Sequence, residues 1–371
     1  MKNILFSTTH FNTVENGPAF FANLLFEKTK TSNEIDLRIL TEDVGNDSKK
    51  IYKLKLQQNI FNRFFYQFFR IRKYHSKSVA ITKRFKFDIL VYNNAFTGVL
   101  STMSNLCPVV VMINDYNRID FIASKFELSK KYFKNLLLFK LEKTAAINAN
   151  TVVVNSIFLK DTIHELYGIP KIKIKVLYKG IDIGKYQFRL RDKFPPKINI
   201  LFVKGGYENG GFHDLIDAIS SLKNSSIKIT IIGPREIDIP LLEKYIKEKG
   251  IKSFELFGPT KPELLKKYFN KADIFCVPSH KEALGVANME ALACGIPVIS
   301  TNVGGIPEVL DYGKCGWLIE AKNSIQLAEA INECINNPRK RVEKSKYGYN
   351  YVQKFNSKNL INNFIDIIDV L

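Results

Sequence analysis

The sequence has no apolar run that approaches the roughly 18 residues needed to cross a bilayer as a helix. Its first residues, MKNILFSTTHF, lack the long apolar stretch and the cleavage site of a signal peptide, and they predict a β-strand instead. The five cysteines are an odd number without metal-type spacing, which favours a reducing compartment over a disulfide framework. These absences predict a cytoplasmic protein, with a peripheral position on the inner face of the cell membrane as the second option.

Motifs for several common chemistries are absent as well. The chain contains neither a phosphate-binding P-loop nor a Gly-x-Ser-x-Gly nucleophile elbow, and no repeat of solenoid period. No acidic cluster lies near a histidine, and the histidines show no metal-ligand pairing. They stand at positions 10, 75, 164, 213 and 280. We therefore expect no metal ion and no cofactor.

The composition is that of a globular protein with an excess of positive charge. The chain has 371 residues, of which 46% are hydrophobic and 25% charged, and this length suits two domains. The formal net charge is +19. Twelve lysines and arginines and no acidic residue lie between Lys49 and Lys86. A field of this sign attracts anions such as phospholipid head groups, nucleic acid or phosphorylated substrates.

Short β-rich runs alternate with amphipathic stretches of helical length along nearly the whole chain. This alternation predicts parallel sheets that are covered by helices on both faces. A charged stretch with a Pro-Pro pair at 188–197 predicts a linker. We expect an α/β protein of two doubly wound domains, at 1–190 and 191–345, with helices at 346–371 crossing back to the first domain. The predicted strands are NILFST, IDLRIL, DILVYN, PVVVMIN, TVVVNS, INILFVK, IKITIIG, FELFG, DIFCVPS, IPVIST and GWLIE.

An aromatic and basic segment at 60–77 has two interpretations. Its apolar residues share one helical face, and its polar residues lie on the other. Either the apolar face packs on the sheet of the first domain beneath a solvated basic face, or the basic surface of segment 49–86 rests on an anionic membrane. No binding motif supports nucleic acid as a partner. The apolar set is Ile60, Phe61, Phe64, Phe65, Phe68 and Phe69, and the polar set is Arg63, Gln67 and Arg70.

The stretch HKEALGVANMEALACGIPVIS, residues 280–300, contains two glutamates eight positions apart. The pattern predicts strand, loop, short helix and strand, with Glu282 in the loop and Glu290 inside the helix. A helix start near Gly285 suits a diphosphate, because its N–H groups are unpaired and glycine permits close approach. The two carboxylates suit hydroxyl groups on either side of that diphosphate. The alternative is a capping box from Ser279 to Glu282, with Glu290 on a solvated face.

The longer stretch PSHKEALGVANMEALACGIPVISTNVGGIPEVL, followed by GKCGWLIE, resembles the signature of the retaining GT4-type glycosyltransferases, which have the GT-B fold. Weaker similarity covers nearly the whole chain, including VVVNSIFLKDTIHELYGIPKIKIKVLYKGIDIGKY. The resemblance implies two Rossmann-like domains that face each other across a cleft. The first would bind the acceptor and the second the nucleotide sugar, UDP- or GDP-linked.

The resemblance also implies roles for individual residues. Glu290 would hold the donor ribose, and Glu282 would contact sugar hydroxyls close to the reacting carbon. The amides of Gly285 and Val286 would hold the diphosphate. Gly258 and Pro259 would flank the nucleobase, and Gly17 would let the first loop approach the phosphates or the acceptor. Gly304 and Gly305 are expected to form a tight loop rather than ligand contacts.

The loop VKGGYENGG departs from the family pattern, which has an arginine and a lysine that neutralise the diphosphate. Here Gly205 and Gly210 align with those two cations, and Gly206 lies beside Gly205 in the donor loop. The loss of the two cations is expected to raise the barrier to departure of the diphosphate, because this leaving group gains negative charge in the transition state. Lys204, one position away, is the first candidate substitute, and Arg235 is the second.

Two further departures concern the first domain. The family often has His-Asp after the fourth strand, where this chain has Asn114-Asp115. Asparagine forms hydrogen bonds but does not titrate, so Asn114 would position the reacting groups or merely cap a turn. Asn16-Gly17-Pro18 replaces two glycines in the first loop and stiffens it.

Together these features predict a retaining glycosyltransferase that moves a sugar from a nucleotide-diphosphate donor to a glycan or polyprenyl-linked acceptor in bacterial cell-surface polysaccharide synthesis. The first alternative is a degenerate relative that acts as a binding or scaffold subunit, which the missing cations motivate. The second is a sugar-nucleotide epimerase of the same architecture.

Overall fold

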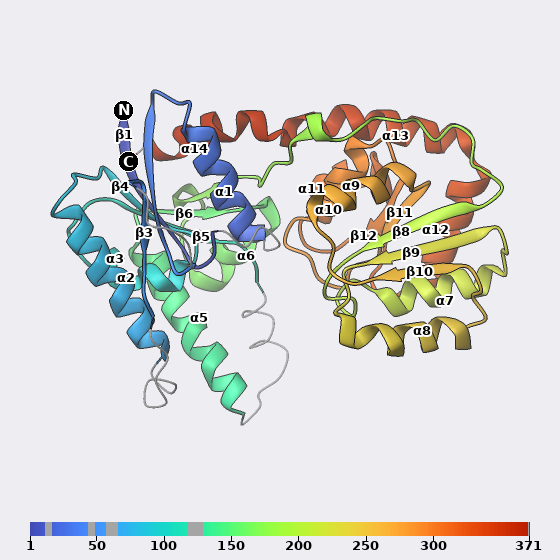
Figure 1. Ribbon diagram of the computed structural model, residues 1–371, viewed down its shortest axis with the longest axis horizontal. Helices are drawn as coiled ribbons and strands as arrows, with labels where there is room; N and C mark the ends of the chain where they lie inside the picture. The colour runs from blue at the N-terminus through green and yellow to red at the C-terminus, as the bar shows by residue number, and fades with distance from the viewer. Residues whose placement is uncertain (12–16, 44–48, 57–65, 117–128, 370) are drawn as a thin grey trace. The chain divides into compact units, whose positions relative to one another are not determined.

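The computed structural model describes residues 1–11, 17–43, 49–56, 66–116, 129–369 and 371 (Figure 1). The chain forms two compact units, Met1–Tyr178 with Asn359–Leu371, and Lys179–Lys358. These limits differ from the predicted borders at 190 and 345. Residues just after 178 and just before 359 belong to the second unit because they bond to each other: the Ile181 amide donates to the Phe355 carbonyl at 3.0 Å. The acceptor- and donor-binding roles of the two domains stay predictions.

The first unit is built on a parallel sheet of seven strands in the order β3-β2-β1-β4-β5-β6-β7. Helices cover both of its faces (Figure 1). The strands are β1 (Lys2–Thr8), β2 (Ile35–Thr41), β3 (Ile51–Lys53), β4 (Ile89–Tyr92), β5 (Val109–Ile113), β6 (Thr151–Val154) and β7 (Ile174–Val176). The helices are α1 (Gly17–Thr29), α2 (Tyr66–Thr82), α3 (Val99–Thr102), α5 (Lys130–Asn148), α6 (Ile157–Tyr167) and α14 (Leu360–Ile368).

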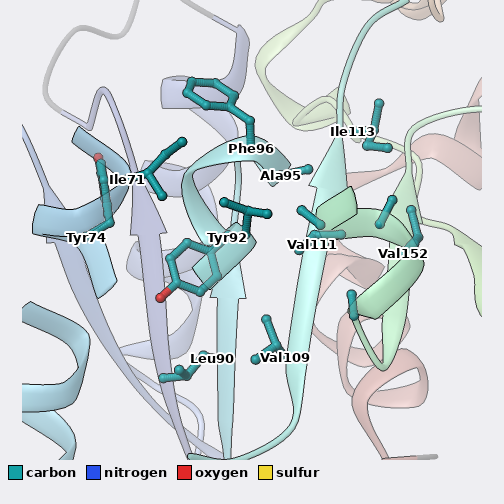
Figure 2. Close-up of a cluster of buried hydrophobic side chains, with 14 of the residues drawn as sticks. Ile71, Tyr74, Leu90, Tyr92, Ala95, Phe96, Val109, Val111, Ile113 and Val152 are labelled. Carbon is teal, nitrogen blue, oxygen red and sulfur yellow. The ribbon is translucent and has the colours of Figure 1, made fainter. Parts of the chain in front are cut away.

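The period of two along the strands divides the core of this unit into two layers. Leu5 and Leu90 face a cluster that includes Tyr74 of α2, and Figure 2 shows part of it. Ile4 and its neighbours on the opposite face pack against α1 and α14, where Phe364 is fully buried. The last helix, α14, therefore packs on the first unit.

Helix α2 presents a different face to the core from the one that the sequence predicted. Phe68 and Phe69 are 48% and 44% exposed, so the prediction that they pack on the sheet is wrong. The buried residues are instead Ile71, Tyr74, Ser78 and Ile81. Arg70, which was placed on the solvated face, is half-buried and forms an ion pair of 2.6 Å with Glu42. Ile60, Phe61, Arg63, Phe64 and Phe65 lie outside the described residues.

The second unit contains a parallel sheet of six strands in the order β10-β9-β8-β11-β12-β13. Helices α7, α8 and α12 lie on one face, and α9, α10 and α11 on the other (Figure 1). The strands are β8 (Ile198–Val203), β9 (Ile227–Ile232), β10 (Phe254–Phe257), β11 (Ile274–Val277), β12 (Val298–Thr301) and β13 (Gly316–Ile319). The helices are α7 (Phe212–Leu222), α8 (Ile239–Glu248), α9 (Pro262–Lys271), α10 (Val286–Ala293), α11 (Ile306–Val309), α12 (Ser324–Asn336) and α13 (Pro338–Val352).

In both sheets the order of the strands reverses beside the first strand, because later strands are added on its other side. In the first unit β1 lies between β2 and β4, and in the second unit β8 lies between β9 and β11. Such a switch point leaves a crevice at the carboxyl ends of the two central strands, where doubly wound folds bind ligands. The α/β prediction of two doubly wound domains is confirmed. Among the described helices, none combines the length and apolar character that crossing a membrane requires.

Candidate functional site

Two loops meet at the switch point of the second unit. One follows β8 and runs from Lys204 to Gly211, and the other follows β11 and runs from Pro278 to Gly285. Gly211 has a φ of +73°, and a Cβ at this position would lie 2.0 Å from the carbonyl oxygen of Pro278. Only glycine fits here, because a side chain would push the two loops apart.

Lys204 and Glu282 form an ion pair between these loops. The Lys204 ammonium contacts Glu282 Oε2, and both side chains are 24% exposed. The other carboxylate oxygen, Glu282 Oε1, accepts a hydrogen bond of 3.0 Å from the Ala283 amide. The capping-box alternative is therefore wrong, since α10 begins at Val286 and Glu282 bonds within its own loop.

The stem of Lys204 fills the space above Gly210. A Cβ on Gly210 would lie 2.8 Å from both Lys204 Cγ and Phe202 Cζ, so this position has no room for a side chain. Phe202 is fully buried, so moving its ring would disrupt the packing of the core. The Lys204 side chain thus reaches from the strand end into the space beside position 210, where the family pattern has a lysine.

The loop after β8 also borders a small cavity. Its volume is 240 Å³, and Gly205, Gly206 and Arg235 line it together with Tyr207, Glu208, Asn209 and Asp238. Arg235 donates two hydrogen bonds to the Asp238 carboxylate, at 2.8 and 2.9 Å, and is 75% exposed. The predicted base-flanking residues follow β10, where Gly258 is half-buried and Pro259 is exposed.

Helix α10 begins beside the Lys204–Glu282 pair. Gly285 precedes its first turn with a φ of +93°, and Val286 is 37% exposed. The first N–H groups of a helix have no partner within it, and they carry the positive end of the helix dipole. Gly295 ends the helix with a φ of +68°, as the sequence predicted.

The predicted tight loop at Gly304 and Gly305 packs against the backbone of Glu282 and Ala283. A Cβ on Gly304 would lie 1.6 Å from the Glu282 carbonyl oxygen, and one on Gly305 would lie 2.4 Å from the Ala283 carbonyl oxygen. The two glycines therefore fix the backbone that carries the Glu282 carboxylate.

Glu290 lies inside α10 and is half-buried. Tyr186, a residue that sequence reasoning missed, donates a hydrogen bond of 2.5 Å to Glu290 Oε1. Burial raises the pKa of the Glu290 carboxyl to about 7, although the bond from Tyr186 and the charge of Lys266 act in the opposite direction. The prediction that Glu290 lies on a solvated face does not hold.

His280 also has a specific partner. Its Nε2 contacts the carboxylate of Asp214 in the first turn of α7, and its backbone amide donates to the Asn209 carbonyl at 2.8 Å. His280 thus ties the two loops of the switch point together. No sequence signal could have paired residues 66 positions apart.

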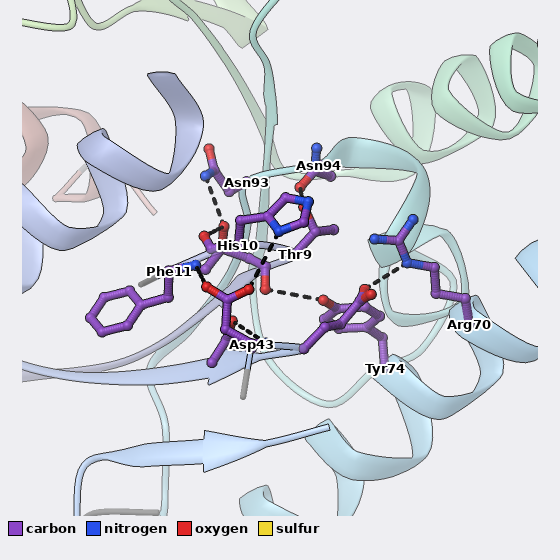
Figure 3. A network of polar contacts seen from close by, with 11 residues as sticks. Thr9, His10, Phe11, Asp43, Arg70, Tyr74, Asn93 and Asn94 are labelled. Atoms are coloured by element: carbon purple, nitrogen blue, oxygen red, sulfur yellow. Dashed lines mark hydrogen bonds and ion pairs between the residues drawn. The ribbon is translucent and has the colours of Figure 1, made fainter. Parts of the chain in front are cut away.

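The switch point of the first unit carries a polar network, which Figure 3 shows. Asn93 Nδ2 donates to the Thr8 hydroxyl at 3.1 Å, and the Thr9 hydroxyl donates to Asn94 Oδ1 at 3.2 Å, so these bonds join the ends of β1 and β4. His10 Nδ1 lies 3.4 Å from Asp43 Oδ1 after β2. Amides, hydroxyls, an imidazole and the Asp43 carboxylate therefore line this edge.

Asn114 belongs to the same edge and follows β5. Its side-chain amide donates to the Asn93 carbonyl at 2.7 Å and to Asn93 Oδ1 at 3.1 Å. It bridges the ends of β4 and β5. Gly17 is the first residue of α1, and Asn16 lies outside the described residues. Within the described part of the chain, no group of three or more histidine, cysteine, aspartate or glutamate side chains could hold a metal ion.

Comparisons with known proteins define the family. The family model described as "Glycosyl transferases group 1" matches residues 187–351, and the one described as "Glycosyltransferase Family 4" matches residues 32–185. The two matches divide the chain close to the border of the units. The chain belongs to the GT4-type glycosyltransferases and is an enzyme of the transferase class.

Two relatives show how far the sequence similarity extends. An uncharacterized 41.2 kDa protein in the cps region of Klebsiella pneumoniae is 26% identical over 330 residues, which is 86% of this chain and 87% of that protein. The capsular polysaccharide biosynthesis glycosyltransferase CapM of Staphylococcus aureus is 30% identical over 244 residues. That match covers 57% of this chain and 62% of CapM.

A solved structure matches the fold. Anabaena Alr3699/HepE in complex with UDP-glucose superposes with a TM-score of 0.76 at 17% identity, covering 100% of both chains. At this identity the likeness concerns the fold, and it confirms the GT-B prediction.

Proposed function

We propose that this protein is a retaining glycosyltransferase that moves a sugar from a nucleotide-diphosphate donor to a glycan or polyprenyl-linked acceptor. The observation that carries the proposal is the Lys204–Glu282 pair at the start of α10, with Glu290 further along the same helix. A cation, helix amides and two carboxylates fit a diphosphate with a sugar ring on each side. The UDP-glucose complex of HepE and the name of CapM support a sugar nucleotide and a cell-surface polysaccharide.

In the proposed reaction the bond between the sugar C1 and the phosphate oxygen breaks, and the diphosphate leaves. The acceptor hydroxyl oxygen bonds to C1 on the same face, and its proton passes to the leaving phosphate oxygen. Lys204 and the amides of Gly285 and Val286 stabilise the charge that develops on the diphosphate. Glu282 hydrogen-bonds hydroxyl groups of the transferred sugar and thereby orients C1.

The donor would occupy the second unit, and the acceptor the first. Gly205, Gly206 and Arg235 line the cavity beside Lys204 and would border the phosphates, while Gly258 and Pro259 would flank the base. The polar edge around Asn114 and Gly17 in the first unit would receive the acceptor. Its amides and hydroxyls suit sugar hydroxyl groups.

A panel of UDP- and GDP-sugars tests this function through donor hydrolysis and through transfer to lipid extracts. We expect one donor to be turned over by the native protein. Glu290→Ala is expected to lower the rate roughly tenfold to a hundredfold, because a half-buried carboxylate that would accept two hydroxyl hydrogen bonds is lost. No turnover with any donor, together with unchanged nucleotide binding in the variant, would favour the scaffold alternative, which the glycines at 205 and 210 motivate.

The exposed face of the first unit suits an anionic membrane surface. Phe68 and Phe69 lie one helical turn before the exposed residues Arg72 and Lys73 on α2, and both phenylalanines are exposed, as is Phe85 just beyond the helix. Lys77 and other exposed basic residues also belong to segment 49–86. Exposed aromatics and basic side chains favour a lipid interface over a solvated face alone. We propose that the protein binds peripherally to the inner face of the membrane through this surface.

Vesicle sedimentation tests the membrane proposal. The native protein is expected to sediment with anionic vesicles and not with neutral ones, since each basic residue near the surface contributes about 1 kcal/mol. Reversing Arg72, Lys73 and Lys77 to glutamate should abolish sedimentation. The matched control reverses Lys244, Lys247 and Lys252 of the second unit, all exposed, and should retain it. Equal binding to neutral vesicles would contradict an electrostatic mechanism.

A further inference from the structure

Tyr186 connects the segment after β7 with α10. It directly follows a short 3-10 helix (Ile183–Lys185), and its backbone amide donates to the Ile183 carbonyl at 3.0 Å. Its ring packs edge-on against Phe269 of α9, with 6.4 Å between ring centroids and an interplanar angle of 90°. Phe269 is fully buried. Because backbone and ring are both anchored, the position of the phenol oxygen is fixed.

The phenol occupies one side of the Glu290 carboxyl group. It donates to Oε1 at 2.5 Å, a short bond of the kind that charged acceptors form. A carboxylate has two oxygens and about four lone-pair positions, so one donor leaves room for the two hydroxyls of a vicinal diol. Without Tyr186, rotation about the terminal bond of the glutamate would let the carboxylate plane vary.

We propose that Tyr186 is a positioning residue for donor binding, which holds Glu290 Oε1 so that the rest of the carboxylate accepts hydrogen bonds from the ribose diol of the nucleotide. This inference rests on the proposed function and adds a residue to its donor site. The ligand class is a ribonucleoside diphosphate, recognised by its 2′- and 3′-hydroxyl groups.

The electrostatic surroundings of Glu290 give this proposal a pH signature. Burial raises the pKa of Glu290 to about 7, and Lys266 of α9 and the Tyr186 bond lower it. Cys294 lies one turn further along α10, where burial raises its own pKa, so the thiol stays neutral. A diol donates two hydrogen bonds only to the ionised carboxylate. Its contribution to affinity is therefore complete above the Glu290 pKa and falls about tenfold per pH unit below it.

Calorimetric titrations with UDP and GDP and with their 2′,3′-dideoxy analogues from pH 5.5 to 8.5 isolate this contribution. Both members of a pair carry the same titrating diphosphate, so their affinity ratio reports the diol alone. For the native protein the affinity for the nucleotide divided by the affinity for its dideoxy analogue is expected to rise with pH and to level off just above pH 7. In Tyr186→Phe the ratio should fall about 3- to 10-fold at pH 7, and its midpoint should move to higher pH, because a bond that stabilises the carboxylate is lost.

Tyr245→Phe is the matched control, since Tyr245 donates to the Asp217 carboxylate at 2.8 Å between α8 and α7, outside the site. It should leave ratio and midpoint unchanged. Equal weakening of both nucleotides in Tyr186→Phe, with the midpoint unmoved, would show a merely structural role and overturn the proposal. A ¹³C NMR titration of Glu290 without ligand separates the two levels. If this midpoint rises in Tyr186→Phe but calorimetry detects no nucleotide binding, the proposed function is contradicted. If the midpoint does not shift but nucleotide binds, only the role of Tyr186 is contradicted.

Discussion

Replacing Lys204 with alanine is expected to lower the rate of sugar transfer roughly 100- to 1,000-fold, the usual loss when one group that stabilises a developing oxyanion is removed. The reason is local, because position 205 has no side chain and a side chain at position 210 would collide with the Lys204 stem. The loop after β8 therefore has Lys204 as its cation at the strand end. Affinity for UDP should fall in the same variant, whereas affinity for uridine should not.

Lys228→Ala is the matched control for this experiment. Lys228 lies on the neighbouring strand β9 and forms an ion pair of 2.6 Å with Glu255, at 29% exposure, so it resembles Lys204 in pairing and burial. It lies near the start of its strand, away from the carboxyl edge. Its loss should leave the rate within a factor of two, because it lies away from the site and a partly exposed ion pair contributes little to stability. Similar losses in both variants would indicate that Lys204 contributes to stability and not to the leaving group.

Gly304→Ala is expected to destabilise the protein by about 3 to 5 kcal/mol and to abolish donor binding. The new methyl group would lie 1.6 Å from the Glu282 carbonyl oxygen, and the φ of +57° is strained for any residue with a Cβ. The loop that carries Glu282 must therefore move. Thermal unfolding should show a midpoint about 10 °C lower, and calorimetry should detect no UDP binding.

Gly250→Ala is the matched control, because it introduces the backbone strain expected in Gly304→Ala without the steric clash. Gly250 belongs to the same unit and has a φ of +76°, but nothing lies within 4 Å of a Cβ at this position. This variant should lose only about 1 to 2 kcal/mol and keep full UDP affinity. If Gly304→Ala bound UDP as the native protein does, the loop of Glu282 would not be part of the donor site.

The sequence was sufficient to predict the architecture but not the edges of the first sheet. The eleven predicted strands all form, because each is a short run rich in β-branched, aromatic or other apolar residues, and most of these runs are buried. β3 (Ile51–Lys53) and β7 (Ile174–Val176) were missed. Each has only three residues and lies at an edge of the sheet, so pairing with one neighbour is what makes it a strand.

The buried face of α2 was predicted wrongly because the prediction followed the phenylalanines and gave too little weight to polar residues that are buried. Phe68 and Phe69 dominate the apolar pattern, yet the core receives Tyr74 and Ser78, whose hydroxyls bond to the Thr8 carbonyl and to Tyr92. Buried polar groups with partners of this kind leave no trace in an apolar pattern.

In the site, local chemistry was predictable and distant pairing was not. The loop and helix around Glu282, Gly285 and Glu290 follow from a continuous stretch with recognisable strand, glycine and helix signals. Tyr186 lies 104 positions from Glu290, and only the fold brings the two side chains together. The same holds for Lys204, which was a candidate by position but whose partner, Glu282, emerged from the structure.

A crystal structure of the native protein with UDP or GDP tests the central claim most directly. The account predicts the diphosphate at the amides of Gly285 and Val286, with Lys204 released from Glu282 to contact it, and the ribose hydroxyls on Glu290. A nucleotide bound away from the carboxyl ends of β8 and β11, with the Glu290 carboxylate facing away from it, would contradict the account.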